Sequence, residues 1–241
     1  MERTPAIEAS NLSKDFGHRA ILRQIDFRAA EGEIIALRGA NGAGKTTLLR
    51  CLASLVRPTS GAVRWFGQPA EANRAARRLI GMVTHEARLY PHLTLCENLM
   101  FAARMYGVND PRRDADHMLD CVSLLPHAQR LPAQVSQGMR HRVAVARALL
   151  HRPRVLLLDE PFSNLDTDGC QWLARTISQW REAGHTICLA THDASRAEQL
   201  ADATFELRSS QLHAMTMCRT SEPAARHAIA DCGFSTRNRA A

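Results

Sequence analysis

Short apolar runs alternate with longer, more polar stretches along most of this chain. Residues 34–37, 155–158 and 186–190 are each almost entirely apolar and are bounded by polar or turn residues. Runs of this length without polar alternation are typical of parallel strands that are covered by helices on both faces. The pattern therefore predicts an α/β fold built on a buried, largely parallel sheet.

The first part of the chain has the signals of a hairpin. Two short strands are expected between Ile7 and about Phe27, joined by a turn at Phe16-Gly17-His18. Other strands are expected at 62–66 and 79–83, and as two short strands over 203–214. Strands are thus expected at both ends of the chain.

The middle of the chain is predominantly helical. Thr94-Leu95-Cys96-Glu97 matches a capping box ahead of an apolar run, which predicts a helix over about 95–106. A second helix is expected over about 112–125, and Ser136 is placed to cap a third that ends near residue 150. We interpret residues 87–150 as a helical insert between α/β segments.

Two further helices, over about 45–55 and 167–183, complete the expected elements. From residue 216 the pattern fades among Ser, Pro, Gly and Arg residues, which predicts a mobile C-terminal tail over 216–241. Residues 1–215 are therefore expected to form one domain.

Composition and charge narrow the class of protein. The chain has 241 residues, 45% of them hydrophobic, which is enough for a sizeable core. The net charge is +7, but no long basic run occurs, so solvated basic faces are expected rather than a nucleic-acid partner. Seven scattered cysteines without a C-x-x-C pair indicate reduced thiols. Without a signal core or a run of about 20 apolar residues, a membrane role is expected to depend on a partner.

A glycine-rich loop separates the strand at 34–37 from the helix that follows. The loop reads Gly39-Ala40-Asn41-Gly42-Ala43-Gly44-Lys45-Thr46 and continues into Thr47. Glycines let backbone N–H groups wrap closely around phosphates, and the helix N-terminus adds its positive dipole end. Lys45 is expected to reach the β- and γ-phosphates and Thr46 to ligate Mg²⁺, as in a P-loop. The sequence therefore predicts nucleotide binding, with Gly39 to Thr47 as the binding loop.

Two acidic residues end the apolar run at 155–158. Asp159 and Glu160 are expected at the carboxyl end of a buried strand, where ligands bind in open α/β sheets. Taken alone, the pair fits a solvated acidic turn. With a P-loop upstream, we expect Asp159 to hold Mg²⁺ and Glu160 to polarise the attacking water.

Three later segments resemble motifs of ABC ATPases. Val135-Ser136-Gln137-Gly138-Met139 is similar to the family's signature, normally Leu-Ser-Gly-Gly-Gln, and an Arg-rich helix follows it. Ser136 and Gly138 are retained, and the resemblance implies that they touch a γ-phosphate. Ser163-Asn164-Leu165-Asp166 resembles the D-loop, and Thr191-His192-Asp193 resembles the segment with the switch histidine, which implies that His192 hydrogen-bonds the γ-phosphate.

Two positions stay open within this resemblance. The family has a Mg²⁺-ligating Gln on the loop that enters the helical insert, whereas this chain has His85 and Glu86 there. Of these two, Glu86 offers the oxygen ligand that Mg²⁺ prefers. Phe16 is a candidate to stack on the nucleotide base, and core packing is the alternative.

The resemblance covers about residues 6–210 and has several implications. It implies a P-loop NTPase of ABC type, with a mixed or parallel sheet core, an N-terminal antiparallel β subdomain and a helical insert. It also implies ATP hydrolysis with Mg²⁺ by two copies paired head to tail, each ATP lying between one P-loop and residues 136–138 of the second copy. Integral membrane transporter subunits are the expected partners, which implies a cytoplasmic, peripheral location on the inner face of the cell membrane.

The transported substrate is suggested by finer details. Gln137-Gly138-Met139 and Thr84-His85-Glu86 resemble the ATP-binding subunit of the haem exporter of cytochrome c maturation. The specific expectation is therefore export, with haem as the solute. ATPases of drug and lipid exporters share these features, and the length also allows a soluble ABC ATPase of the iron–sulfur assembly kind.

Overall fold

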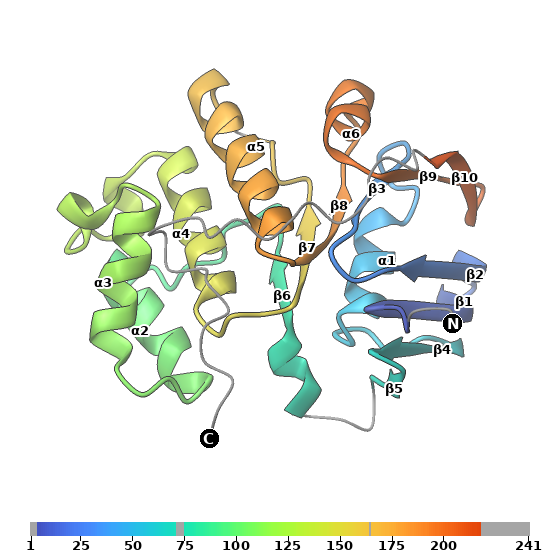
Figure 1. Ribbon diagram of the computed structural model, residues 1–241, viewed down its shortest axis with the longest axis horizontal. Helices are drawn as coiled ribbons and strands as arrows, with labels where there is room; N and C mark the ends of the chain where they lie inside the picture. The colour runs from blue at the N-terminus through green and yellow to red at the C-terminus, as the bar shows by residue number, and fades with distance from the viewer. Residues whose placement is uncertain (1–3, 71–74, 164, 218–241) are drawn as a thin grey trace.

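The computed structural model describes residues 4–70, 75–163 and 165–217. Within these ranges the chain forms two β-sheets, with helices α2, α3 and α4 gathered at the opposite end from the N-terminal strands (Figure 1). The α/β class predicted from the apolar runs is confirmed.

The N-terminal sheet is antiparallel and has the strand order β2-β1-β4-β5. β1 spans Ile7–Phe16 and β2 spans Arg19–Ala29, so the two strands are longer than the short pair that was expected. Gly17, at a φ of 58°, supplies a left-handed residue in the turn between them. β4 (Ser60–Trp65) pairs with β1, and β5 (Gln68–Pro69) pairs with β4.

The larger sheet has the strand order β10-β9-β3-β8-β7-β6. All neighbouring strands in it are parallel except β10, which runs antiparallel to β9. The strands are β3 (Ile34–Arg38), β6 (Ile80–Val83), β7 (Val155–Asp159), β8 (Thr186–Ala190), β9 (Ala203–Arg208) and β10 (Gln211–Met217). The predicted mixed sheet core is thus confirmed.

The end of β10 corrects the expected start of the tail. Thr216 and Met217 pair with Thr204 and Ala203 of β9, so the first two residues of the predicted tail at 216–241 belong to a strand. The hairpin with β9 extends the ladder past the point where the hydrophobic pattern fades. Residues 218–241 lie outside the described residues, and the prediction of a mobile tail there stays a prediction.

Side chains of the central strands alternate between two cores. Leu156 and Leu158 of β7 pack into the cluster beneath the helical insert, whereas Val155 and Leu157 pack into the cluster facing the antiparallel sheet. Every residue of β7 and β8 is buried. Because successive side chains of a strand point to opposite faces, a strand buried on both faces needs apolar residues throughout.

Helix α1 (Lys45–Leu52) lies between the two sheets and starts at the glycine loop (Figure 1). It contacts β1 and β2 on one side and β7 and β8 on the other. Leu48, Leu49 and Leu52 are fully buried in the core that the two sheets share. The glycine loop is therefore attached to the rigid centre of the molecule.

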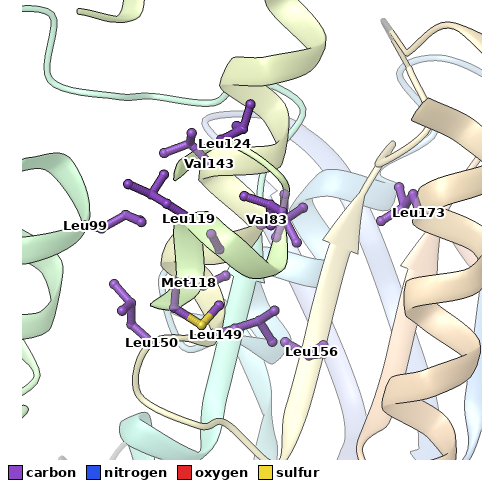
Figure 2. Packing of buried hydrophobic residues seen from close by; sticks show 14 of the residues in the cluster. Val83, Leu99, Met118, Leu119, Leu124, Val143, Leu149, Leu150, Leu156 and Leu173 are labelled. Carbon is purple, nitrogen blue, oxygen red and sulfur yellow. The ribbon is translucent and has the colours of Figure 1, made fainter. Parts of the chain in front are cut away.

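Three helices form the insert: α2 (Leu95–Met105), α3 (Pro111–Cys121) and α4 (Gln137–Leu149). The predicted capping box is present, since Thr94 and Glu97 bond each other's backbone. Figure 2 shows side chains of these helices converging on those of β6 and β7, for example Leu99, Val143 and Leu156. The insert therefore packs on the sheet through a continuous apolar core.

Smaller elements differ from the expected pattern. α3 ends at Cys121 rather than near residue 125, because Ser123 has a left-handed φ of 58°, which does not continue a right-handed helix. α5 (Thr167–Glu182) was expected, whereas α6 (Ala194–Leu200) was not. Short 3₁₀ turns span η1 (Ala75–Leu79), η2 (Leu125–His127) and η3 (Pro132–Gln134).

Candidate functional site

Four loops meet at the carboxyl edge of the larger sheet. The glycine loop follows β3, His85 follows β6, Glu160 follows β7, and His192 lies just beyond β8. These four strands are consecutive in the sheet and parallel, so their carboxyl ends lie along one edge. Ligands of open α/β sheets bind at this edge.

The glycine loop needs its glycines for both conformation and space. Gly39, Gly42 and Gly44 have φ angles of 149°, 78° and 111°. A Cβ on Gly39 would lie 2.6 Å from Leu207 O, and one on Gly44 would lie 3.0 Å from Ile21 Cγ2. Gly44 is the N-cap of α1 and offers no side-chain cap, so the first N–H groups of the helix stay available to an anion.

Lys45 is buried, with 6% of its surface exposed, and its ammonium lies within the loop. Nζ donates to Gly39 O at 2.7 Å and to Ala40 O at 3.2 Å, and it lies 3.3 Å from Glu160 Oε1. The other predicted binding residues follow the same loop: Asn41 is exposed, and Ala43 and Thr47 are half-buried. A positive charge held at this point can pair with phosphate oxygens.

Thr46 and Asp159 form an oxygen-rich pair beside the loop. Thr46 Oγ1 donates to Asp159 Oδ1 at 3.0 Å, and Asp159 is 2% exposed. The pKa of Asp159 is raised above its ordinary value, mainly by burial. The hydrogen bond from Thr46 lowers this pKa in part, and the negative charge of Glu160 raises it. A carboxylate that is destabilised by burial and flanked by a hydroxyl suits a hard cation such as Mg²⁺. In the described ranges no three or more His, Cys, Asp or Glu side chains are grouped so that they could hold a metal ion.

Glu160 is held firmly at its backbone and at its carboxylate. Its φ of 49° is left-handed, a conformation that is strained for a residue with a Cβ. Its N–H donates to Ala190 O at 2.9 Å, which ties it to the end of β8. Oε1 faces Lys45 Nζ, and Oε2 lies 2.9 Å from Nδ1 of His192. Strain that is maintained by surrounding contacts is typical of functional sites.

The structure therefore brings together Lys45, Thr46, Asp159, Glu160 and His192. His192 is largely exposed, with 65% of its side-chain surface accessible, and meets the site through Glu160. Thr191, beside it, is buried and accepts a hydrogen bond from the Asp193 N–H at 3.1 Å. The exposed imidazole of His192 therefore follows a buried residue, Thr191, and can reach a ligand at the surface.

Ser136 and Gly138 lie at the start of α4 in the helical insert. Ser136 is the N-cap and accepts from the Met139 N–H at 3.2 Å. A Cβ on Gly138 would meet nothing closer than Leu165 Cδ2 at 3.7 Å, so the fold of this chain does not require glycine there. Among the residues described, no hydrogen bond or ion pair joins these two to the glycine loop. They form a second, separate surface of the candidate site.

The loop after β6 presents His85 and Glu86 in different ways. Glu86 is exposed and its Oε2 lies 3.5 Å from Arg88 Nε, whereas His85 Nδ1 lies 2.8 Å from Ser163 Oγ. His85, rather than Glu86, is therefore in contact with the segment that follows Glu160. Metal binding by Glu86 stays a prediction that would require the side chain to leave Arg88.

Phe16 is 53% exposed at the end of β1, so the alternative of core packing is not what the structure has. Lys14 Nζ lies 4.9 Å from the centre of its ring. An exposed ring of this kind is open to a stacking partner, and base stacking stays a prediction.

Asn164 of the proposed D-loop lies outside the described residues, whereas Asp166 of that segment caps α5 by accepting from Gly169 N–H at 2.8 Å.

Two arginines of α4 support the site through contacts that the sequence pattern did not predict. Arg140 Nη1 donates to Val135 O at 2.8 Å and braces the segment before Ser136. Arg147 donates to Arg88 O at 2.7 Å and to Ala87 O at 2.8 Å, which holds the loop after β6. The Arg-rich character of this helix is visible in the sequence. The partners of the two arginines are not, because every residue type carries a backbone carbonyl.

A sequence profile described as ABC transporter matches residues 22–163. The chain belongs to the ABC transporter family. The sulfate/thiosulfate import ATP-binding protein CysA of Mesorhizobium japonicum is 38% identical over 203 residues, which cover 81% of this chain and 59% of that protein. The glutamine transport ATP-binding protein GlnQ of Escherichia coli is 38% identical over 202 residues, covering 81% of this chain and 84% of GlnQ. The chain thus spans about three fifths of the CysA relative.

Solved structures of ABC proteins share the fold. The ATP-binding cassette MJ0796, in a dimeric post-hydrolysis state bound to ADP and Pi, has a TM-score of 0.81 at 26% identity and covers 89% of this chain and 100% of its own. An ATP-binding subunit of an ABC transporter has a TM-score of 0.79 at 29% identity, with 88% and 90% covered. The ABC ATPase fold implied by the motifs is confirmed, and this chain is an ABC ATPase domain. Haem export receives no support from these relatives.

Proposed function

We propose that this ABC ATPase domain hydrolyses ATP to drive solute transport through separate membrane subunits. The position of Glu160 carries the proposal: one carboxylate oxygen faces Lys45 Nζ at 3.3 Å and the other faces His192 Nδ1 at 2.9 Å. Lys45 is suited to bind the phosphates, so Glu160 lies where an attacking water would approach the γ-phosphate. A general base has to be within hydrogen-bond reach of the proton that it takes.

Each side chain has a separate task in this mechanism. Lys45 and the N–H groups at the start of α1 bind the phosphates, and Glu160 accepts a proton from the attacking water. His192 orients the carboxylate of Glu160, and its largely exposed imidazole remains open to a ligand. Thr46 and Asp159 would hold Mg²⁺, which when bound neutralises charge on the phosphate oxygens.

A second copy of the chain would complete the site. In the described part of the chain, no hydrogen bond or ion pair joins Ser136 or Gly138 to the glycine loop, and a Cβ on Gly138 would meet only ordinary contacts, the nearest with Leu165 Cδ2 at 3.7 Å. Because glycine carries no side chain, a phosphate of another protomer could approach the N-terminus of α4 closely. Support comes from MJ0796, whose matched structure is described as dimeric and bound to ADP and Pi.

Membrane partners follow from the transport role rather than from this chain itself. No helix in the parts of the chain that the structure describes is long and apolar enough to cross a membrane. From the transport role of the relatives, we expect peripheral attachment, at the cytoplasmic face, to integral membrane subunits.

The transported solute is inferred from resemblance alone. The relatives are named for sulfate/thiosulfate import and glutamine transport, whereas Gln137-Gly138-Met139 and Thr84-His85-Glu86 favour export of haem. The full chain should be purified from native membranes and its partners identified. Integral membrane proteins in the complex, with ATP hydrolysis that rises on adding haem but not sulfate or glutamine, would support haem export. Purification with soluble iron–sulfur assembly proteins alone would contradict the transport proposal.

A further inference from the structure

We propose that His85 is a positioning residue that acts through Ser163 on Glu160, an inference that rests on the hydrolysis proposed above. Ser163 Oγ lies 2.8 Å from His85 Nδ1 and 2.6 Å from the backbone O of Glu160. One hydroxyl thus joins the loop after β6 to the backbone of the proposed general base. The sequence motifs assign no role to this contact.

The direction of the two hydrogen bonds follows from the hydroxyl itself. Ser163 has one hydroxyl proton, and a carbonyl oxygen can only accept. Two oxygens 2.6 Å apart require a proton between them, so Ser163 donates to Glu160 O. Ser163 Oγ must then accept from His85, which fixes the proton on Nδ1 of the imidazole.

The contact acts on a backbone that would otherwise relax. Glu160 has a left-handed φ of 49°, and its carbonyl accepts from both the Ser163 N–H at 3.1 Å and the Ser163 hydroxyl. Together with the bond from Glu160 N–H to Ala190 O, these bonds hold the peptide on both sides of its Cα. The backbone of Glu160 determines where its carboxylate points. Loss of the His85 contact would therefore let the carboxylate of Glu160 shift from its position.

Neighbouring strands explain why His85 and Ser163 meet. β6 and β7 are adjacent and parallel, with Val83 paired to Leu158, so the segments after both strands leave the sheet side by side. The far side of the His85 loop is held by Arg147, which binds the carbonyls of Ala87 and Arg88. The loop is therefore a rigid support that connects α4 of the insert to the Glu160 backbone.

The test is a double-mutant cycle on the full chain, with ATP hydrolysis measured at saturating Mg·ATP. The variants are His85→Ala, Ser163→Ala, the double variant, and His85→Asn, whose side-chain amide can replace the Nδ1–H donor. His92→Ala, at an exposed histidine of the same loop, is the matched control. Melting temperatures show that each variant is folded.

We expect each single alanine variant to lower kcat on the order of ten- to a hundredfold with KM for ATP unchanged, as for a misplaced catalytic group. The double variant should be no worse than either single one, because both break the same relay. His85→Asn should recover most of kcat, and His92→Ala should match the wild type. The inference would be overturned if the kcat losses of the two single variants multiplied in the double variant. It would also be overturned if His85→Asn were as slow as His85→Ala, or if only KM changed. A wild-type chain without hydrolysis would instead contradict the proposed function.

Discussion

The ammonium of Lys45 lies 3.3 Å from the carboxylate of Glu160, although the two residues are 115 positions apart in the chain (160 − 45). Lys45 begins α1 after β3, and Glu160 follows β7, so the sheet edge brings them together. Both are largely buried, with 7% and 17% of their side-chain surfaces exposed. A nucleotide that binds the ammonium therefore arrives directly beside the carboxylate.

The first prediction concerns this ammonium. Lys45→Ala removes a charged donor from the phosphate site, which should weaken ATP binding by roughly 1.5–3 kcal/mol, about ten- to 150-fold in Kd. Lys45→Arg should also bind poorly, because a wide planar guanidinium does not fit where Nζ sits 2.7 Å from Gly39 O. Titration with a fluorescent ATP analogue measures both, with Arg64→Ala, at an exposed position of β4, as the control. If Lys45→Ala bound the ATP analogue with wild-type affinity, the assignment of the glycine loop as the phosphate-binding site would be wrong.

The second prediction separates base stacking at Phe16 from a structural role. Phe16→Ala should raise the Kd for ATP by an amount corresponding to about 1–3 kcal/mol of stacking, while Phe16→Trp should retain affinity. Because the ring is 53% exposed, the melting temperature should change little. A lower melting temperature with unchanged Kd would show that the ring serves the fold and does not touch the base.

The third prediction is that Ser136 acts on the nucleotide of the other protomer. Ser136→Arg and Lys45→Ala should each be inactive alone. In a mixed dimer, one site has an intact P-loop facing an intact signature, and the other site holds both lesions. Random pairing of equal amounts should restore about a quarter of the wild-type rate, if the two sites work independently. If mixed dimers form but no ratio restores hydrolysis, the head-to-tail arrangement is wrong.

The fourth prediction concerns stability at low pH. Burial lowers the pKa of His185, which is 7% exposed and uses Nδ1 to donate to Pro153 O at 2.7 Å. Below the unfolded pKa of about 6.5, the unfolded chain takes up a proton that the folded chain resists. Stability should therefore fall as pH drops below about 6.5, by up to about 1.4 kcal/mol per pH unit for this histidine.

His185→Asn tests this effect, because the amide can keep the bond to Pro153 O and cannot titrate. Unfolding by urea at pH 7.5 and pH 5.5 should show a smaller loss of stability in His185→Asn than in the wild type. His213→Asn, on exposed β10, is the control and should show the wild-type loss. An equal loss in all three proteins would mean that His185 does not contribute.

The sequence predicts those parts of the molecule that are encoded locally. The apolar runs that form β7 and β8 are buried on both faces, so nearly every position in them is apolar and the strands can be recognised from sequence. α6 was missed because Ala197 is its one buried residue, which leaves no apolar stripe to detect. The end of β10 was missed because it depends on pairing with β9, which is a tertiary contact.

The same limit applies to the site. Lys45, Asp159 and Glu160 were predicted because a glycine loop and an acidic strand end are recognisable within a few residues. The contact between His85 and Ser163 was not, since the residues are 78 positions apart and meet through strand pairing. The choice between His85 and Glu86 likewise depends on loop geometry, in which Glu86 turns toward Arg88.

The most direct test of the account is the ATPase rate of Glu160→Gln, followed together with its size-exclusion profile in the presence and absence of Mg·ATP. Gln keeps the shape of the side chain but cannot accept the proton, so hydrolysis should fall by roughly 10²–10⁴-fold while ATP still binds. The loss of a negative charge beside the γ-phosphate should also favour an ATP-bound dimer, visible as an earlier elution peak. Hydrolysis by Glu160→Gln at the wild-type rate would contradict the central claim that Glu160 is the general base.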